Sequence, residues 1–428
     1  MKVRLALLLG AICLGVQQFF YRIIALRNPV SLMDSDSAEY LACARQFALY
    51  GNFDHHACLV RPPTYPVILA LADTASGRMF PAVLINHLLV TLAAVILFAV
   101  LSRFLTQTRA FAFSLFFGLD LVLLKYTNTI LSEPAFILFF TASLACLGMV
   151  LEKGRWFTGL ILCAVLQSVS VLIRPIAMLW PWVQAALLAF WIFRPQKEKT
   201  AGALKPWLAL AIYLLITVGT QLVWSEHNAR VFGYRTLSKV GIDQLVGYRM
   251  ASILEHGPFD TREEALSWIE KRTVGKLNGK ALTSQSAEKI YKVLFFEIVR
   301  DHPAAFVAAE FHSFWRILFG GVVPEFAAKG EKLRVLHRIM KHTYTVAFIL
   351  FFVLVVYGMV RKFRDVSPGT PEPVLRFSVL TAAMIMVYFL VMGSPGGMAR
   401  FKIPFLPAFY FLAAIGYDSL PKKLRVFG

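Results

Sequence analysis

The chain has 428 residues, of which 58% are hydrophobic and 16% are charged. Together with a mean hydropathy of +0.63, this composition excludes a soluble globular protein of ordinary make-up. The formal net charge of +19 raises the question of a nucleic-acid partner, but the basic residues gather in alternate connections between apolar runs. That arrangement is a topology signal of membrane proteins, so no nucleic-acid partner is expected.

Apolar runs of the length that a bilayer requires recur along most of the sequence. A spanning helix needs about 20 predominantly apolar residues, and about 10–12 such helices fit this chain. We therefore expect an all-α polytopic membrane protein, with spans near residues 3–24, 80–101, 110–126, 133–151, 156–173, 176–193, 206–224, 343–361, 374–392 and 402–417. The first run also has the basic start of a signal peptide, but no small-residue cleavage site follows, so it is expected to stay as the first span.

The orientation follows from the basic residues, because Lys and Arg in short loops are retained on the cytoplasmic side. They lie before the first span and after every second one, at Lys2, Arg4, Arg103, Arg109, Lys153, Arg155, Arg194, Lys197, Lys199, Lys205, Arg361, Lys362, Arg364, Arg376, Lys422, Lys423 and Arg425. Both termini are therefore expected in the cytoplasm, in an inner or plasma membrane whose anionic lipids attract these loops.

This topology divides the chain into an N-terminal transmembrane module, an extracytoplasmic helical segment and a C-terminal transmembrane module, at residues 1–224, 225–342 and 343–428. In the middle segment, Thr261 and Glu264 form a capping box that predicts an amphipathic helix. The apolar and aromatic stretch 304–321 carries several charges and is expected to lie along the membrane interface instead of crossing it.

The first outer loop, residues 25–79, opens with three acids, Asp34, Asp36 and Glu39, in the stretch SLMDSDSAEY. Asp36 followed by an alanine-rich run and Gly51 is typical of a helix that begins at an acidic cap and ends at a glycine. A carboxylate held at a membrane surface is also available as a general base. From the residues alone, both interpretations of Asp36 stay open.

Four stretches share the outer side of the predicted membrane and follow one another in a fixed order. They contain Asp36, Tyr40, Ala42, Ala44, Gly51, Arg61, Pro62, Pro63 and Tyr65, then Ser132 to Pro134, then Arg174, and finally Arg400 to Pro404. In this pattern the chain resembles the GT-C superfamily of integral membrane glycosyltransferases, in particular the branch of protein O-mannosyltransferases and lipid A aminoarabinose transferases. The likeness covers the N-terminal part well, the C-terminal end moderately and the middle only in layout.

The resemblance implies an enzyme that moves a sugar from a polyprenyl-phosphate donor to a hydroxyl acceptor on a glycan, lipid or protein, on the extracytoplasmic side and with inversion. Asp36 would take the proton of the acceptor hydroxyl, and Tyr40 and Tyr65 would line the substrate. The departing phosphate needs fixed cations. The candidates are Arg61, Arg174, Arg400 and Lys402, although the first two could instead snorkel to the interface.

Several acids complicate this assignment. Many members of the family carry an acid directly after the catalytic Asp, where this chain has Ser37. Asp34 is a rival base, or one half of an Asp-x-Asp metal site. Glu133 would orient an arginine or a sugar hydroxyl, or form a purely structural ion pair. Asp120 in the third span should face the bundle or water, because a charge facing lipid is costly.

No cofactor is expected to be required. Asp54, His55 and His56 are metal-ligand types, but adjacent histidines in an exposed loop more often bind nothing, so a divalent cation is only the alternative. Cys43 and Cys58 share the first outer loop, where an oxidising compartment permits a disulfide. Two unpaired buried cysteines are the other interpretation.

Two other functions remain to be separated from sugar transfer. A transporter or flippase of lipid-linked envelope precursors would be expected to show repeated halves and ionisable groups near the midplane, whereas here the acids and outer arginines gather at one surface. A non-catalytic partner that binds the lipid carrier would keep the same basic residues.

Overall fold

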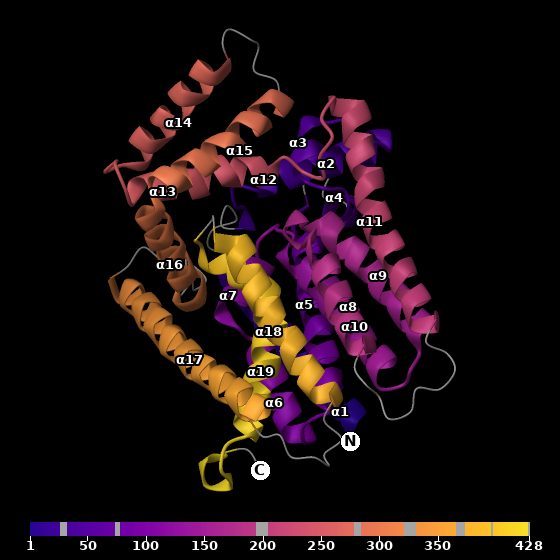
Figure 1. Cartoon of the computed structure of the whole chain (residues 1–428). Helices are drawn as coiled ribbons and strands as arrows, with labels where there is room; N and C mark the ends of the chain where they lie inside the picture. The colour runs from indigo at the N-terminus through magenta and orange to yellow at the C-terminus, as the bar shows by residue number, and fades with distance from the viewer. Residues whose placement is uncertain are drawn as a thin grey trace.

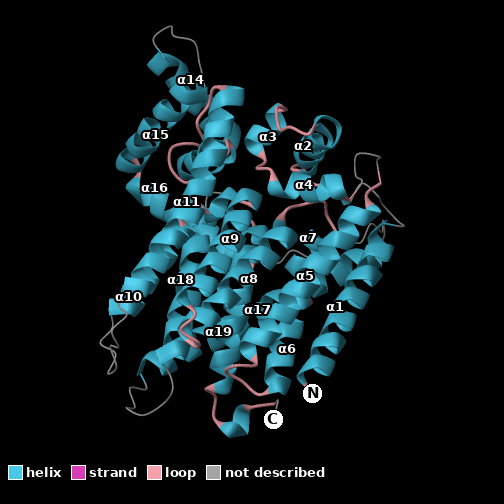
Figure 2. Ribbon diagram, turned by 90° about the vertical axis from the view of Figure 1, so that its right-hand side faces the viewer, coloured by secondary structure: helices cyan, strands magenta, loops and turns pink. Residues whose placement is uncertain are grey.

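The computed structural model describes residues 1–25, 32–72, 78–193, 204–277, 284–320, 331–364, 373–394 and 397–426. Within these ranges the regular elements are all helical and there is no β-strand, which confirms the all-α prediction. The long helices stand side by side as a bundle, and shorter helices gather at one of its ends (Figure 1 and Figure 2).

In the described part of the chain, nine helical segments are long and apolar enough to cross a membrane, and each overlaps a predicted span. The protein is therefore an integral membrane protein. The helices are α1 (Lys2–Ala25), α5 (Phe80–Leu101), α8 (Glu133–Leu151), α9 (Trp156–Ile173), α10 (Trp180–Phe193), α11 (Leu204–Phe232), α17 (Glu331–Arg364), α18 (Pro373–Gly393) and α19 (Leu406–Asp418). Short 3-10 turns precede two of them, η3 (Pro175–Ala177) before α10 and η6 (Ala399–Phe405) before α19; a third, η7 (Lys422–Leu424), follows α19. Two of the spanning helices extend well beyond their predicted spans: α11 continues to Phe232 and α17 begins at Glu331.

The predicted span 110–126 is not one straight helix. It is divided into α6 (Gln107–Gly118) and α7 (Leu121–Thr127), which are bent by 52°. The cause is Asp120, whose carboxylate accepts hydrogen bonds from the backbone N–H groups of Val122 and Leu123 and so caps α7. Because this capped acid is buried in the bundle, its charge avoids lipid.

One end of the bundle is covered by the helices of the first outer loop and of the middle segment. They are α2 (Ser37–Tyr50), α3 (His56–Val60), α4 (Thr64–Leu71), α12 (Val240–Gln244), the π-helix η4 (Leu245–Met250), α13 (Ala251–Glu255), α14 (Arg262–Leu277), α15 (Ser284–Asp301) and α16 (Pro303–Phe319). Helices α13 to α16 share an apolar cluster of their own. The chain termini lie at the opposite end (Figure 1 and Figure 2).

Helix α16 matches the stretch expected at the membrane interface, and it is not among the described helices that qualify as spans. It exposes a stripe of apolar side chains, Val307, Phe311 and Trp315, at the spacing of one helical face. The opposite side of the helix packs into the cluster with α13. A helix with one exposed apolar face and one packed face suits an interfacial position.

Helix α19 is the central helix of the bundle, and nearly all of its side chains are buried. It follows directly from η6, whose residues are also buried. A buried helix preceded by a tight turn holds that turn in a fixed place, so η6 can present a side chain accurately to the covered end.

Candidate active site

The carboxylate of Asp36 lies between two arginines that come from distant parts of the chain. Its Oδ1 is 2.9 Å from Arg61 Nη2, and its Oδ2 is 2.7 Å from Arg400 Nη2. Asp36 occupies the N-cap position of α2, but its side chain makes no capping hydrogen bond. The helix-cap interpretation therefore explains where Asp36 lies in the chain, but it does not explain the contacts of the carboxylate. The carboxylate pairs with the two arginines, and the side chain is 18% exposed.

Arg61 is held by two further contacts from α2. Its Nε donates to Glu39 Oε2 at 2.7 Å, and its guanidinium lies over the ring of Tyr40 at 5.0 Å. Glu39 follows Asp36 by about one helical turn, so both carboxylates face the same arginine. The two carboxylates thereby fix the orientation of the planar guanidinium.

Arg174 and Glu133 form a second ion pair, with 2.5 Å between Nη1 and Oε1. Glu133 is only 1% exposed, and its other oxygen, Oε2, has no hydrogen-bond partner among the described residues. Arg174 also donates to Ser132 Oγ at 3.4 Å, and this hydroxyl bonds the Tyr40 hydroxyl at 2.7 Å. Through Ser132, the second pair is joined to the helix that follows Asp36.

We call these six residues the arginine cluster: Asp36, Glu39, Arg61, Glu133, Arg174 and Arg400. Arg400 Nε, like Glu133 Oε2, is buried with no hydrogen-bond partner in the described part of the chain. Buried polar atoms are normally satisfied. Arg400 Nε is a hydrogen-bond donor and Glu133 Oε2 is an acceptor. A ligand in the arginine cluster could therefore form hydrogen bonds with both.

The charges in the arginine cluster set the protonation of Asp36. Burial alone would raise the pKa of this carboxyl, but the charges of Arg400 and Arg61, the hydrogen bond from Arg400 and the charge of Arg174 outweigh burial, and the pKa is lowered from its ordinary value. Asp36 is therefore ionised at neutral pH, which is the form that accepts a proton.

Tyr40 and Tyr65, expected to line a substrate, are both buried and meet edge to face with 5.0 Å between ring centroids. Tyr65 also shares a 3.4 Å hydrogen bond with Asn86 of α5. Burial raises the pKa of Tyr65 well above its usual range. The two rings connect α2, α4 and α5, and the Tyr40 ring contacts Arg61 of the arginine cluster.

Lys402 lies apart from the arginine cluster, although it is two residues from Arg400. It is 0% exposed, and its ammonium donates to the carbonyl oxygens of Leu318 (2.9 Å) and Gly320 (3.1 Å) at the end of α16. It also lies 4.1 Å from the ring centroid of Phe348. Because its ammonium is held by these carbonyls and this ring, the structure does not bring Lys402 to Asp36.

The remaining predicted acids and histidines form no shared site. Asp34 Oδ1 accepts from the backbone and hydroxyl of Ser35, as in a local turn. His55 caps α3 by accepting from Ala57 N, and its ring lies 4.4 Å from that of His56. In the described residues, no three His, Cys, Asp or Glu side chains group as metal ligands.

Cys43 and Cys58 are joined by a disulfide, with 5.3 Å between their Cα atoms. The bond links α2, which follows Asp36, to α3, which precedes Arg61. Since Asp36 and Arg61 directly flank the two linked helices, the disulfide restrains the distance between them.

One residue of the arginine cluster was not identified as a site residue from the sequence. Glu39 was noted only as an early acid of the helix, although its spacing from Asp36 places both on one face. Asp243 of α12 could not be placed near the cluster without the fold: burial raises the pKa of this carboxyl, and the charges of Lys239, Glu39 and Arg61 act on it. The middle segment reaches the site because Ser238 Oγ donates to the carbonyl of Val60 at 2.6 Å.

No protein-family model and no curated protein matches the sequence. Among solved structures, the fold is similar to the archaeal oligosaccharyltransferase AglB from Archaeoglobus fulgidus, in complex with an inhibitory peptide and a dolichol-phosphate. The chains are 12% identical with a TM-score of 0.49, and the match covers 96% of this chain and 50% of that one. The present chain thus spans about half the length of that protein. The GT-C resemblance remains a prediction, and the arginine cluster itself carries the functional proposal.

Proposed function

We propose that the protein is an inverting glycosyltransferase that moves a sugar from a polyprenyl-phosphate donor to a hydroxyl acceptor on the extracytoplasmic side of the membrane. The observation that carries the proposal is the Asp36 carboxylate, which is free of its helix and held between Arg61 and Arg400. An ionised acid beside several buried cations, at one end of a membrane bundle, has the parts needed to activate a hydroxyl and to stabilise a phosphate leaving group.

The proposed step is a single displacement. The acceptor oxygen forms a bond to the anomeric carbon, the bond between that carbon and the donor phosphate oxygen breaks, and the acceptor proton passes to Asp36. The electron pair of the broken bond stays with the polyprenyl phosphate, whose added negative charge is stabilised by the guanidinium groups. Arginine is well suited to this role because its planar fork binds phosphate oxygens in pairs.

The same arginines would link donor binding to the strength of the base. A donor phosphate that accepts hydrogen bonds from Arg61 and Arg400 competes with Asp36 for them. As its ion pairs weaken, the carboxylate holds a proton more readily. Donor binding would in this way prepare the base for the acceptor, and Arg174 with Glu133 would keep a further charged pair next to the same phosphate or sugar.

The cluster needs no resident metal for this chemistry, because guanidinium groups supply the positive charge. A divalent cation is the alternative, and a chelator separates the two. Full transfer activity after treatment with EDTA is expected, whereas loss of activity that added Mg²⁺ or Mn²⁺ restores would assign the charge stabilisation to a metal.

The decisive experiment replaces Asp36 by Asn, which retains N-cap capacity. Purified Asp36→Asn protein should keep its fold in detergent and lose transfer of labelled sugar from polyprenyl phosphate to a hydroxyl acceptor, by about 10²–10⁴-fold. Asp34→Asn is the matched control and should stay near wild type. Near wild-type transfer by Asp36→Asn would end the assignment of the base. The assay uses no sealed vesicle, so turnover in it would also count against a transporter.

A further inference from the structure

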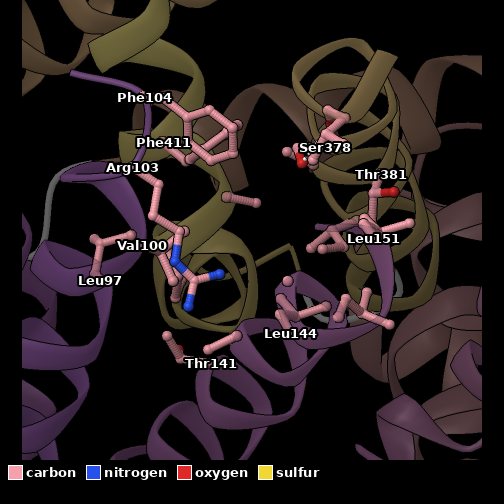
Figure 3. A pocket seen from close by; sticks show the side chains of 18 of the residues that line it. Leu97, Val100, Arg103, Phe104, Thr141, Leu144, Leu151, Ser378, Thr381 and Phe411 are labelled. Atoms are coloured by element: carbon pink, nitrogen blue, oxygen red, sulfur yellow. Dashed lines mark hydrogen bonds between the residues drawn. The ribbon is translucent and has the colours of Figure 1, made fainter. Parts of the chain in front are cut away.

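A cavity lies away from the arginine cluster, between α5, α8, α18 and α19 (Figure 3). It encloses about 100 Å³ and is lined mainly by apolar side chains, among them Leu97, Leu144, Ile385 and Phe411. At one end it reaches Arg103 and Glu152, in the connections that end α5 and α8. The cavity therefore opens toward the end of the bundle that holds the chain termini.

Two hydroxyl groups in this cavity have no hydrogen-bond partner in the described part of the chain. Thr141 is 4% exposed and Thr381 is 6% exposed, both line the cavity, and neither Oγ1 is hydrogen-bonded within the described residues. A threonine inside a helix commonly donates to the carbonyl one turn back, and neither of these does so. A buried polar atom without a partner costs free energy, so both hydroxyls are available to a ligand that carries oxygen acceptors.

Arg103 lies across the cavity rim (Figure 3). Its guanidinium passes over Gly148 of α8 so closely that a Cβ at Gly148 would lie 1.8 Å from Nη1. Only a glycine leaves this room. The guanidinium is 3.5 Å from Glu152, which also lines the cavity, a long distance for an ion pair. Arg103 is thus the cation at the rim, and the facing helix accommodates it.

We propose that this cavity binds an anionic diacyl phospholipid from the leaflet at the terminal end of the bundle. The phosphate would be held by Arg103, and one acyl chain would lie along α8 and α18. The free hydroxyls of Thr141 and Thr381 lie on the chain side of the guanidinium. A glycerophospholipid carries its ester oxygens on that same side of its phosphate.

The order of the chemical groups separates this lipid from the proposed sugar donor. A polyprenyl chain has no oxygen beyond its phosphate, so it would leave both hydroxyls unpaired. Its phosphate would moreover have to lie at the far end of the bundle, beside Arg61 and Arg400. An anionic phospholipid offers a partner for each feature of the cavity: its phosphate for Arg103, an acyl chain for the apolar walls and its ester oxygens for the two hydroxyls.

The test measures lipid binding to the purified full-length protein in detergent by native mass spectrometry and thermal shift, with phosphatidylglycerol and phosphatidylcholine of identical chains. Phosphatidylglycerol should bind about tenfold more tightly, equivalent to ~1.4 kcal/mol. Arg103→Gln should abolish that preference, and Gly148→Ala should do the same by displacing the guanidinium. Thr141→Val and Thr381→Val keep the side-chain shape and should each weaken phosphatidylglycerol binding several-fold.

Two control variants have the same chemistry outside the cavity. Arg155→Gln removes a cation at the same end, and Thr91→Val removes another buried unpartnered hydroxyl; both should bind as the wild type does. Equal binding of the two lipids, or unchanged binding by Gly148→Ala and Thr141→Val, would overturn the proposal. Displacement of phosphatidylglycerol by polyprenyl phosphate would reassign the cavity to the donor. None of these outcomes depends on sugar transfer.

Discussion

At the scale of single residues, the proposed role of Asp36 sets two conflicting requirements: the carboxylate must be ionised, and it must also be basic enough to accept a proton. Its ion pairs with Arg61 and Arg400 lower its pKa, which keeps it ionised but makes it a weak acceptor of protons. A general base works best when its pKa is close to the working pH. The conflict is resolved if the arginines turn toward a donor phosphate during the reaction, because the carboxylate then regains basicity when it is needed.

This view predicts a shift in the pH dependence of Arg400→Gln. Asp36 is active when ionised, so kcat/KM should fall as the pH drops through the pKa of Asp36 in the free protein. In the wild type that pKa is below the ordinary value, and Arg400 is the largest of the charges that lower it. Removing this charge should move the acidic limb of the kcat/KM profile to higher pH, whatever the loss in absolute rate.

Arg400→Lys is the matched control, since it keeps the charge and should leave the limb near its wild-type position. An acidic limb at the same pH in the Gln and wild-type proteins would show that Arg400 does not hold the carboxylate in solution. The same ion pairs stabilise the fold at pH values above the unfolded pKa of Asp36, and this contribution is lost as the pH falls through the lowered folded pKa.

The sequence was informative about the residues at the covered end and less so about their partners. The order of the motifs singled out Asp36, Arg61, Arg174 and Arg400, and the structure places them in one cluster. The sequence did not show that Arg400 and Lys402 point in different directions, as residues two apart on a 3-10 turn do. That separation becomes visible only once α16 and α17 are packed against η6.

At the scale of elements, close backbone contact fixes the central helix. A Cβ at Gly416 of α19 would lie 1.9 Å from the carbonyl oxygen of Leu354 in α17, and one at Gly358 would lie 2.5 Å from the Cα of Gly416. Small residues permit such approach between membrane helices. Because α19 follows η6, this contact also supports the position of Arg400.

Gly416→Ala is therefore expected to destabilise the protein by about 1–3 kcal/mol through overpacking, seen as a lower Tm in detergent. Gly219→Ala in α11 is the control: nothing lies within 4 Å of the added Cβ, so its Tm should stay the same or rise slightly. Equal Tm values for Gly416→Ala and the wild type would mean that α17 and α19 separate easily.

The membrane spans could be predicted because long apolar runs have few alternatives to a helix in lipid. The bend at Asp120 could not be predicted in this way. The run 110–126 is apolar on both sides of this acid, and only the packed structure shows that Tyr344 and Tyr410 donate to its carboxylate at 3.0 Å and 2.9 Å. These tyrosines come from α17 and α19, far along the chain, so no local sequence pattern around Asp120 could predict these contacts.

At the scale of the whole molecule, the covered end and the end with both termini are opposite (Figure 1). The distribution of basic loops predicts that the termini face the cytoplasm. A cysteine introduced at exposed Glu263 of α14 should then react with a membrane-impermeant thiol reagent in intact cells. One introduced at exposed Lys153, after α8, should react only after the membrane is permeabilised.

Each engineered cysteine is compared with the parent protein, whose free thiols are the buried Cys13 and Cys163 and the half-buried Cys146, and in which Cys43 and Cys58 are bonded to each other. Labelling of the Lys153 position in intact cells, without labelling of the Glu263 position, would reverse the proposed orientation. The arginine cluster would then face the cytoplasm and could not use an extracytoplasmic donor.

The ion pair between Asp36 and Arg400 joins residues 364 positions apart in the chain. During synthesis, the acid emerges with the first membrane segments, whereas its partner arrives only when the last described span is inserted. Until then only Arg61 and Arg174 of the arginine cluster can balance the carboxylate. Assembly of the proposed reaction centre is thus coupled to insertion of that span, and a ribosome-bound chain that is still growing holds the proposed base and one of the proposed leaving-group cations in separate, unfinished halves.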